Sequence, residues 1–201
     1  MQEISKSELY DISGGGVVLD IGAFDCKDSN EFAEMGATVY AFEPVHLPVG
    51  LHKNVAFFPY AVGAADKITV INTSPHAQSN SIRKPKTHLE LFPNVPYTGR
   101  VSVEMVRLDT WYKGISRLKR MSEIALIWAD VNGCEGDLIA GAGEVLKRTK
   151  YLFIETSDKE LFEGQITTDE LIKLLPGWEV LGMYNHLGNF GNILMKNGNT
   201  I

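Results

Sequence analysis

The chain has 201 residues, of which 44% are hydrophobic and 22% charged, and its formal net charge is −6 at pH 7. This composition fits a globular domain and excludes a low-complexity chain, and the acidic balance disfavours a nucleic-acid-binding protein. No apolar run is long enough to span a membrane, and the start lacks the apolar core of a signal peptide, so we expect a cytoplasmic protein. The first predicted strand begins near the N-terminus, which leaves open that the single domain over 1–201 was excised from a larger polypeptide.

Two hydrophobic patterns alternate along the chain. Short β-branched runs predict strands at 17–21, 38–42, 55–60, 68–72, 101–108, 124–130, 151–155, 179–184 and 191–195. Helical patterns lie between several of them, at 29–35, 110–118, 135–147 and 168–175. This alternation predicts an α/β fold with a mostly parallel, doubly wound sheet. The connection between the last two strands is too short for a crossover helix, so they should form an antiparallel hairpin.

An irregular segment interrupts this pattern at about 73–100. Prolines at 75, 85, 93 and 96 prevent long regular elements there. Long loops in compact domains are usually functional. We expect this segment to lie over the carboxyl ends of the strands as a substrate lid.

The first strand–turn–helix–strand unit has the arrangement that a nucleotide-like ligand needs. Gly22 lies in the turn, and the second strand ends at Glu43, which can accept hydrogen bonds from ribose hydroxyls. A dinucleotide site requires three glycines, but this turn has only one, with Asp20 before it and Cys26 in a later glycine position. An acid at this place favours a cationic ligand, and S-adenosylmethionine (SAM) fits better than a dinucleotide.

Seven segments, in this order, resemble the FkbM family of SAM-dependent methyltransferases. They are D-I-G-A at 20–23, A-F-E-P at 41–44, A-V-G at 61–63 with a following hairpin strand, S-N-S-I at 79–82, R-L-D-T at 107–110, D-V-N-G-C-E at 130–135 and F-I-E at 153–155. Cys26 and Asn132 depart from the family pattern, where a glycine and a glutamate are usual. The resemblance implies a Rossmann-like class I methyltransferase fold, with a mostly parallel seven-stranded sheet and a C-terminal antiparallel hairpin. It also implies O-methylation of a sugar hydroxyl in a glycan or glycoconjugate, with a weak preference for a deoxyhexose such as rhamnose.

The candidate SAM-binding residues follow the strand ends. Gly22 and Ala23 would allow the backbone to approach the methionine part of SAM, while Asp20 or Asp25 would accept from its ammonium group. Gly22 also has a purely structural interpretation as a tight turn. Glu43 would bind the ribose. The other candidates are Ala61 and Val62 at the adenine edge, which ordinary strand packing explains almost equally well, and Phe24, Pro44, Ser81, Asp130 and Val131.

Asp130 and Glu155 are the main catalytic candidates because they end neighbouring predicted strands. A sugar hydroxyl is a poor nucleophile and needs a base or a metal ion. Asp130 as general base, and Asp130 with Glu155 as ligands of a Mg²⁺-like ion, are equally compatible with the sequence. A salt-bridged strand end is the structural alternative for Glu155. His76, His88 and His186 are further candidate bases, with His76 and His88 in the lid segment.

Two other functions remain open at this point. A nicotinamide-dependent oxidoreductase would use the same first unit, but it requires the missing glycines and further parallel strands instead of the hairpin. A non-catalytic SAM-binding domain would tolerate loss of Glu43 or Asp130, yet both are present. The expected partner is a carbohydrate acceptor, without nucleic acid or a membrane span.

Overall fold

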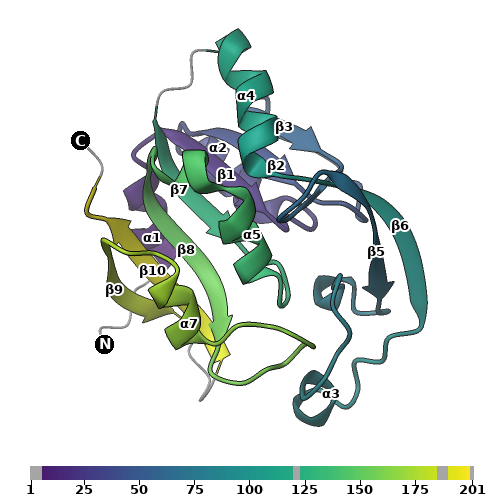
Figure 1. Cartoon of the computed structure of the whole chain (residues 1–201). Helices are drawn as coiled ribbons and strands as arrows, with labels where there is room; N and C mark the ends of the chain where they lie inside the picture. Colours follow the sequence, from purple (N-terminus) through teal and green to yellow (C-terminus); the bar gives the residue numbers. More distant parts are fainter. Residues whose placement is uncertain (1–5, 120–122, 185–189, 200–201) are drawn as a thin grey trace.

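A seven-stranded sheet in the order β3-β2-β1-β7-β8-β10-β9 organises the computed structural model, which describes residues 6–119, 123–184 and 190–199 (Figure 1). Neighbouring strands are parallel from β3 to β8, and β10 runs antiparallel to both β8 and β9. The predicted C-terminal hairpin and the predicted methyltransferase-like sheet are therefore confirmed. The strands of this sheet are β1 (Val17–Ile21), β2 (Thr38–Phe42), β3 (Val55–Phe58), β7 (Ile124–Ala129), β8 (Thr149–Ser157), β9 (Trp178–Tyr184) and β10 (Phe190–Asn197).

Helices cover both faces of this sheet because successive strand residues point to opposite sides. In β1, Leu19 and Ile21 join the core beneath α4 (Leu108–Lys119), α5 (Glu135–Gly141), α6 (Gly143–Leu146) and α7 (Thr168–Lys173). Val18 points the other way, into a core with α1 (Lys6–Ser13) and α2 (Lys27–Glu34). Burial on both faces explains why these strands are continuous apolar runs in the sequence.

A second sheet of three strands was not predicted as such. It has the order β4-β6-β5, with β4 at Ala61–Val62, β5 at Lys67–Thr73 and β6 at Gly99–Val106. The expected hairpin of β4 with β5 is wrong, because β6 lies between them, parallel to β4 and antiparallel to β5. Asp66 ties the turn between β4 and β5 to the start of α4, accepting from the Arg107 amide and the Thr110 hydroxyl.

The predicted helix at 135–147 is divided into α5 and α6. Gly141 packs so closely that a Cβ there would lie 2.0 Å from the Gly63 carbonyl oxygen. Ala142 leaves the helical conformation, and the Asp109 carboxylate then accepts from the amides of Glu144 and Val145 at the start of α6. Asp109 therefore has a structural role.

The lid segment connects β5 to β6 and contains the 3₁₀ turn η1 (Ala77–Ser79) and the short helix α3 (His88–Leu91). In Figure 1 the second sheet and α3 lie to the right of the main sheet, and the loop after β8 reaches toward them. A bridge between Pro85 and Phe162 joins that loop to the lid. Among the described residues, no helix is long and apolar enough to cross a membrane.

Candidate active site

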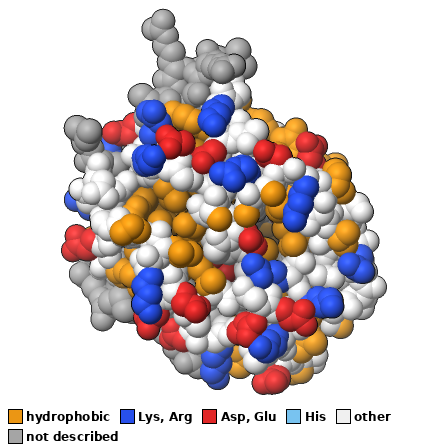
Figure 2. Space-filling view, in the orientation of Figure 1, with side chains coloured by type: hydrophobic (Ala, Val, Ile, Leu, Met, Phe, Trp, Pro, Cys, Tyr) orange, Lys and Arg blue, Asp and Glu red, His pale blue; other side chains and the backbone are white. Residues whose placement is uncertain are grey.

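A cavity of about 470 Å³ lies where the carboxyl ends of β1, β2, β7 and β8 meet the lid. Its size is in the range of small-molecule sites, which is about 300–1,000 Å³. Of the predicted site residues, those that line the cavity are Asp20, Gly22, Ala23, Phe24, Asp25, Glu43, Pro44, Ala61, Val62, Asp130, Val131 and Glu155. On the face shown in Figure 2, acidic and basic side chains are interspersed, and the described residues form no continuous basic stripe there.

Gly22 brings two loops of the cavity together. Its φ is +82°, and a Cβ at this position would lie 1.8 Å from the carbonyl oxygen of Asp130. The amides of Gly22 and Ala23 both donate to the Phe42 carbonyl, at 2.9 and 3.0 Å. Glycine is therefore required at this position because the loops after β1 and β7 approach each other closely. The amides of Gly22 and Ala23 are not free for a ligand, since both donate to the carbonyl of Phe42 in β2.

The turn after Gly22 contains two residues in the left-handed region. Phe24 has a φ of 46° and Cys26 a φ of 59°, a conformation that favours glycine. The Phe24 ring packs on His46, with ring centroids 4.7 Å apart. The Cys26 thiol is fully buried, and burial raises its pKa to about 12. Cys26 thus adopts the backbone conformation of the glycine it replaces, and its thiol serves as a packing group.

Acidic side chains surround the β1 end of the cavity. Asp20 is buried and accepts from the Ser29 hydroxyl; burial raises its pKa to about 7, against the lowering effect of that hydrogen bond. Asp25 accepts from the Lys27 amide and lines the cavity, as does Asp28. This wall suits a positively charged group.

Glu43, at the end of β2, is held in place by the backbone that follows it. Its Oε1 accepts from the amides of Val45 at 2.7 Å and His46 at 3.0 Å. No described residue donates to Oε2, and Glu43 lines the cavity. One carboxylate oxygen therefore fixes the side chain, and the other is open to a ligand hydroxyl.

Asp130 and Glu155 lie side by side because β7 and β8 pair in parallel, with Ala129 opposite Ile154. The Asp130 carboxylate faces the cavity, which is surrounded by protein. Burial raises the pKa of Asp130 to about 6, and hydrogen bonds from the Asn132 amide and from Glu155 partly offset this rise. Burial and the negative charge of Asp130 raise the pKa of Glu155 well above its usual range. The directions of these shifts favour an arrangement in which Glu155 donates a hydrogen bond to Asp130.

The sequence model of the methyltransferase FkbM domain matches residues 20–188. The chain belongs to the FkbM methyltransferase family. This FkbM domain is 33% identical over 199 residues to the 2-O-methyltransferase NoeI of Sinorhizobium fredii (strain NBRC 101917 / NGR234), an alignment that covers 90% of the chain and 79% of NoeI. The protein is therefore a SAM-dependent methyltransferase, and the oxidoreductase alternative is wrong.

Two solved structures are distantly similar to the FkbM domain. Burkholderia thailandensis 1,6-didemethyltoxoflavin-N1-methyltransferase, with bound 1,6-didemethyltoxoflavin and S-adenosylhomocysteine, is 15% identical with a TM-score of 0.43, covering 90% of this chain and 70% of that one. Monomeric WbdD is 12% identical with a TM-score of 0.41, and the match covers 90% of this chain but only 36% of WbdD. No residue role follows from these similarities.

The metal alternative gains no support from the described residues. The part of the chain that the structure describes contains no group of three or more His, Cys, Asp or Glu side chains placed to hold a metal ion. Among the described residues, Asp130 and Glu155 thus have no third side chain of these types placed to complete a metal site with them.

The structure separates the candidate histidines. His76 is exposed and does not line the cavity, and His186 lies outside the described residues. His88 lines the cavity from the lid and is 6% exposed. Of the two candidate histidines that the structure describes, His88 is therefore the one that reaches the cavity.

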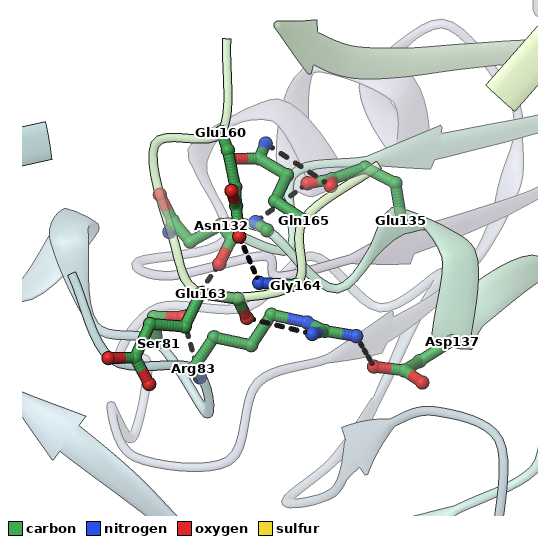
Figure 3. A network of polar contacts seen from close by, with 10 residues as sticks. Ser81, Arg83, Asn132, Glu135, Asp137, Glu160, Glu163, Gly164 and Gln165 are labelled. Carbon is green, nitrogen blue, oxygen red and sulfur yellow. Dashed lines mark hydrogen bonds and ion pairs between the residues drawn. The ribbon is translucent and has the colours of Figure 1, made fainter. Parts of the chain in front are cut away.

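Ser81 is the other candidate that lies outside the cavity wall. Its hydroxyl is buried and donates to the Asn132 carbonyl at 2.6 Å (Figure 3). The Asn132 side chain donates in turn to the Gln78 carbonyl at 2.8 Å. Asn132, which departs from the family pattern, therefore fastens the lid to the loop that carries Asp130.

Arg83 fastens the lid at a second point. Its guanidinium pairs with Asp137 on α5 at 2.8 Å and donates to the Glu163 carbonyl at 2.9 Å (Figure 3). Beside it, Glu135 accepts from the Gly133 amide and, at 3.4 Å, from the Gln165 side chain. The lid is thus joined to the loop after β7, which carries Asp130, to α5 and to the loop after β8.

Proposed function

We propose that this protein transfers a methyl group from SAM to a hydroxyl group of a sugar in a glycan or glycoconjugate. The observation that carries the proposal is the Asp130–Glu155 pair, which faces the cavity and retains an ionised oxygen near neutral pH. The similarity to NoeI, a 2-O-methyltransferase, supports oxygen as the acceptor atom. The reaction would take place in the cytoplasm, where the two free, buried cysteines remain reduced.

The acidic end of the cavity suits SAM. Asp20 and Asp25 would face its ammonium group, and the open oxygen of Glu43 would accept from the ribose. Ala61 and Val62 would contact the adenine. The remaining contacts in this half of the cavity would come from Gly22, Ala23, Phe24, Pro44 and Val131.

Asp130 would act as the general base. Bound SAM supplies a methyl group on a cationic sulfur, and its transfer to a hydroxyl oxygen releases one proton. Asp130 would accept this proton because Glu155 keeps its own and so leaves Asp130 ionised. Glu155 would hold the Asp130 carboxylate in place through its hydrogen bond, which makes it a positioning residue.

A deoxyhexose fits the opposite wall better than a fully hydroxylated sugar. The lid, the loop after β8 and the start of β10 contribute apolar side chains there, namely Ile82, Phe92, Val95, Leu161, Phe162 and Phe190. A sugar methyl group can be buried against such a wall, whereas an additional hydroxyl would lose its hydration.

Calorimetry with SAM and NAD, followed by methyl-transfer assays on a panel of methyl glycosides, tests the proposal. We expect binding of SAM only, and faster transfer to methyl α-L-rhamnoside than to methyl α-L-mannoside, which carries one additional hydroxyl. Asp130→Asn should reduce kcat by about 10²–10⁴-fold with little change in the Kd of SAM. EDTA should leave turnover unchanged.

Each part of the proposal can fail separately. Absence of SAM binding would contradict the cofactor assignment. SAM binding without methylation of any glycoside would refute a sugar acceptor, and a preference for the mannoside would refute the deoxyhexose. A fully active Asp130→Asn variant would remove Asp130 as the base.

A further inference from the structure

His88 packs in an aromatic wall of the cavity that three separate segments build. Its ring centroid lies 5.0 Å from that of Phe92, 5.7 Å from that of Tyr97 and 5.0 Å from that of Phe162. Phe92 in turn contacts Phe190 at the start of β10, with 6.3 Å between the centroids. His88, Phe92, Phe162 and Phe190 all line the cavity. Since β8 and β10 lie beyond β7 from β1 and β2 in the main sheet, the wall lies on the side of the cavity away from Asp20 and Glu43.

The His88 ring carries a buried nitrogen that lacks a hydrogen-bond partner among the described residues. Nδ1 is inaccessible to solvent and has no hydrogen-bond partner among the described residues. Burial lowers the pKa of the ring, so the imidazole is neutral at neutral pH. A buried polar atom without a partner destabilises a fold, whereas a phenylalanine would preserve the aromatic packing without that penalty. Packing alone does not explain a histidine here.

The other ring nitrogen is the one that a ligand can reach. Nε2 is not sealed off as Nδ1 is, the described residues make no hydrogen bond to it, and His88 lines the cavity. A neutral imidazole offers one donor and one acceptor, so Nε2 can bond to a hydroxyl in either sense. His88 thus places a single polar atom within an aromatic wall, a combination that fixes the orientation of a ligand.

We propose that His88 is a specificity-determining residue of the acceptor subsite. The rings of Phe92, Phe162 and Phe190 receive an apolar face of the sugar, and the His88 ring hydrogen-bonds a hydroxyl other than the one that is methylated. This inference rests on the proposed function and extends it, because it assigns recognition of the acceptor to the lid and leaves proton transfer to Asp130.

The test compares wild type, His88→Phe, His88→Gln and the matched control His76→Gln, an exposed histidine of the same lid. The probes are the best methyl glycoside acceptor and its monodeoxy analogues. One of the analogues should lack the hydroxyl that His88 binds, which is not the hydroxyl that is methylated. For this analogue, the kcat/KM of wild type should be about ten- to hundredfold lower than for the parent glycoside. His88→Phe should lose this discrimination, mainly through a higher KM for the parent glycoside, and His88→Gln should retain part of it.

Two further measurements separate recognition from folding. The Kd of SAM should be unchanged in every variant, and the melting temperature of His88→Phe should equal or exceed that of wild type, because the substitution removes the unpartnered Nδ1. If His88→Phe discriminates among the analogues as wild type does, or if His76→Gln has the same effect, the assignment of His88 is wrong while the proposed function stands. If wild type methylates no glycoside, the proposed function fails and this assignment with it.

Discussion

Substitution of Gly22 by alanine should destabilise the domain in two measurable parts. A left-handed backbone costs an L-residue about 1–2 kcal/mol. The added Cβ would lie 1.8 Å from the Asp130 carbonyl oxygen, so the loops after β1 and β7 must separate. Overpacking of this kind costs roughly 1–3 kcal/mol, which gives a total of about 2–5 kcal/mol. This is a large share of a typical domain stability of about 5–15 kcal/mol.

Gly36→Ala is the matched control, because Gly36 has a φ of +96° but open space around the position of its Cβ. Urea unfolding of both variants, followed by tryptophan fluorescence, separates backbone strain from the loop clash. Gly36→Ala should lower the free energy of unfolding by about 1–2 kcal/mol. Gly22→Ala should lower it by about 2–5 kcal/mol, because the clash adds to the cost of the left-handed backbone. Gly22→Ala should also lose methyl transfer while still folded, since the clash displaces Asp130. Equal destabilisation of the two variants would refute the reasoning.

Two predictions concern the buried acids. The value of kcat/KM should rise as pH increases through about 6, where Asp130 loses its proton. Glu155→Leu should move this rise to higher pH, because the hydrogen bond from Glu155 lowers the pKa of Asp130. Glu155→Gln keeps a hydrogen-bond donor and should leave the pH of the rise nearly unchanged. A pH profile that is identical in all three proteins would argue against the pair. Burial raises the pKa of Glu135 to about 7, so the folded state binds a proton that the unfolded state has released above about 4.5. The free energy of unfolding should therefore fall as pH rises from about 4.5 to 7. Urea titrations at several pH values should show a smaller fall for Glu135→Gln than for wild type.

The sequence predicted the main sheet well because its strands are buried on both faces and read as apolar, β-branched runs. It also predicted that Asp130 and Glu155 would meet, since each ends a predicted strand and the carboxyl ends of neighbouring parallel strands align. In the structure Asp130 follows β7 and Glu155 lies near the end of β8. These features depend on local pattern and on a general rule of sheet topology.

What the sequence did not predict depends on contacts between distant segments. The order of the second sheet follows from β6 entering between β4 and β5, and the break before α6 follows from the packing of Gly141 against Gly63. The distinction between His76 and His88 has the same origin, because the ring of Phe162, from the loop after β8, completes the aromatic wall around His88. No local pattern encodes such contacts.

The position of β1 has a consequence for how the protein is made. β1 lies in the middle of the main sheet, and its second neighbour, β7, follows the whole second sheet and the lid in the chain. A chain emerging from the ribosome therefore exposes one edge of an apolar β-strand until β7 arrives, and unpaired edges of this kind favour aggregation. The cavity needs the loops after both strands, so a ligand of the cavity can stabilise only the completed domain. Such a ligand therefore cannot protect the first half of the chain before β7 has been made.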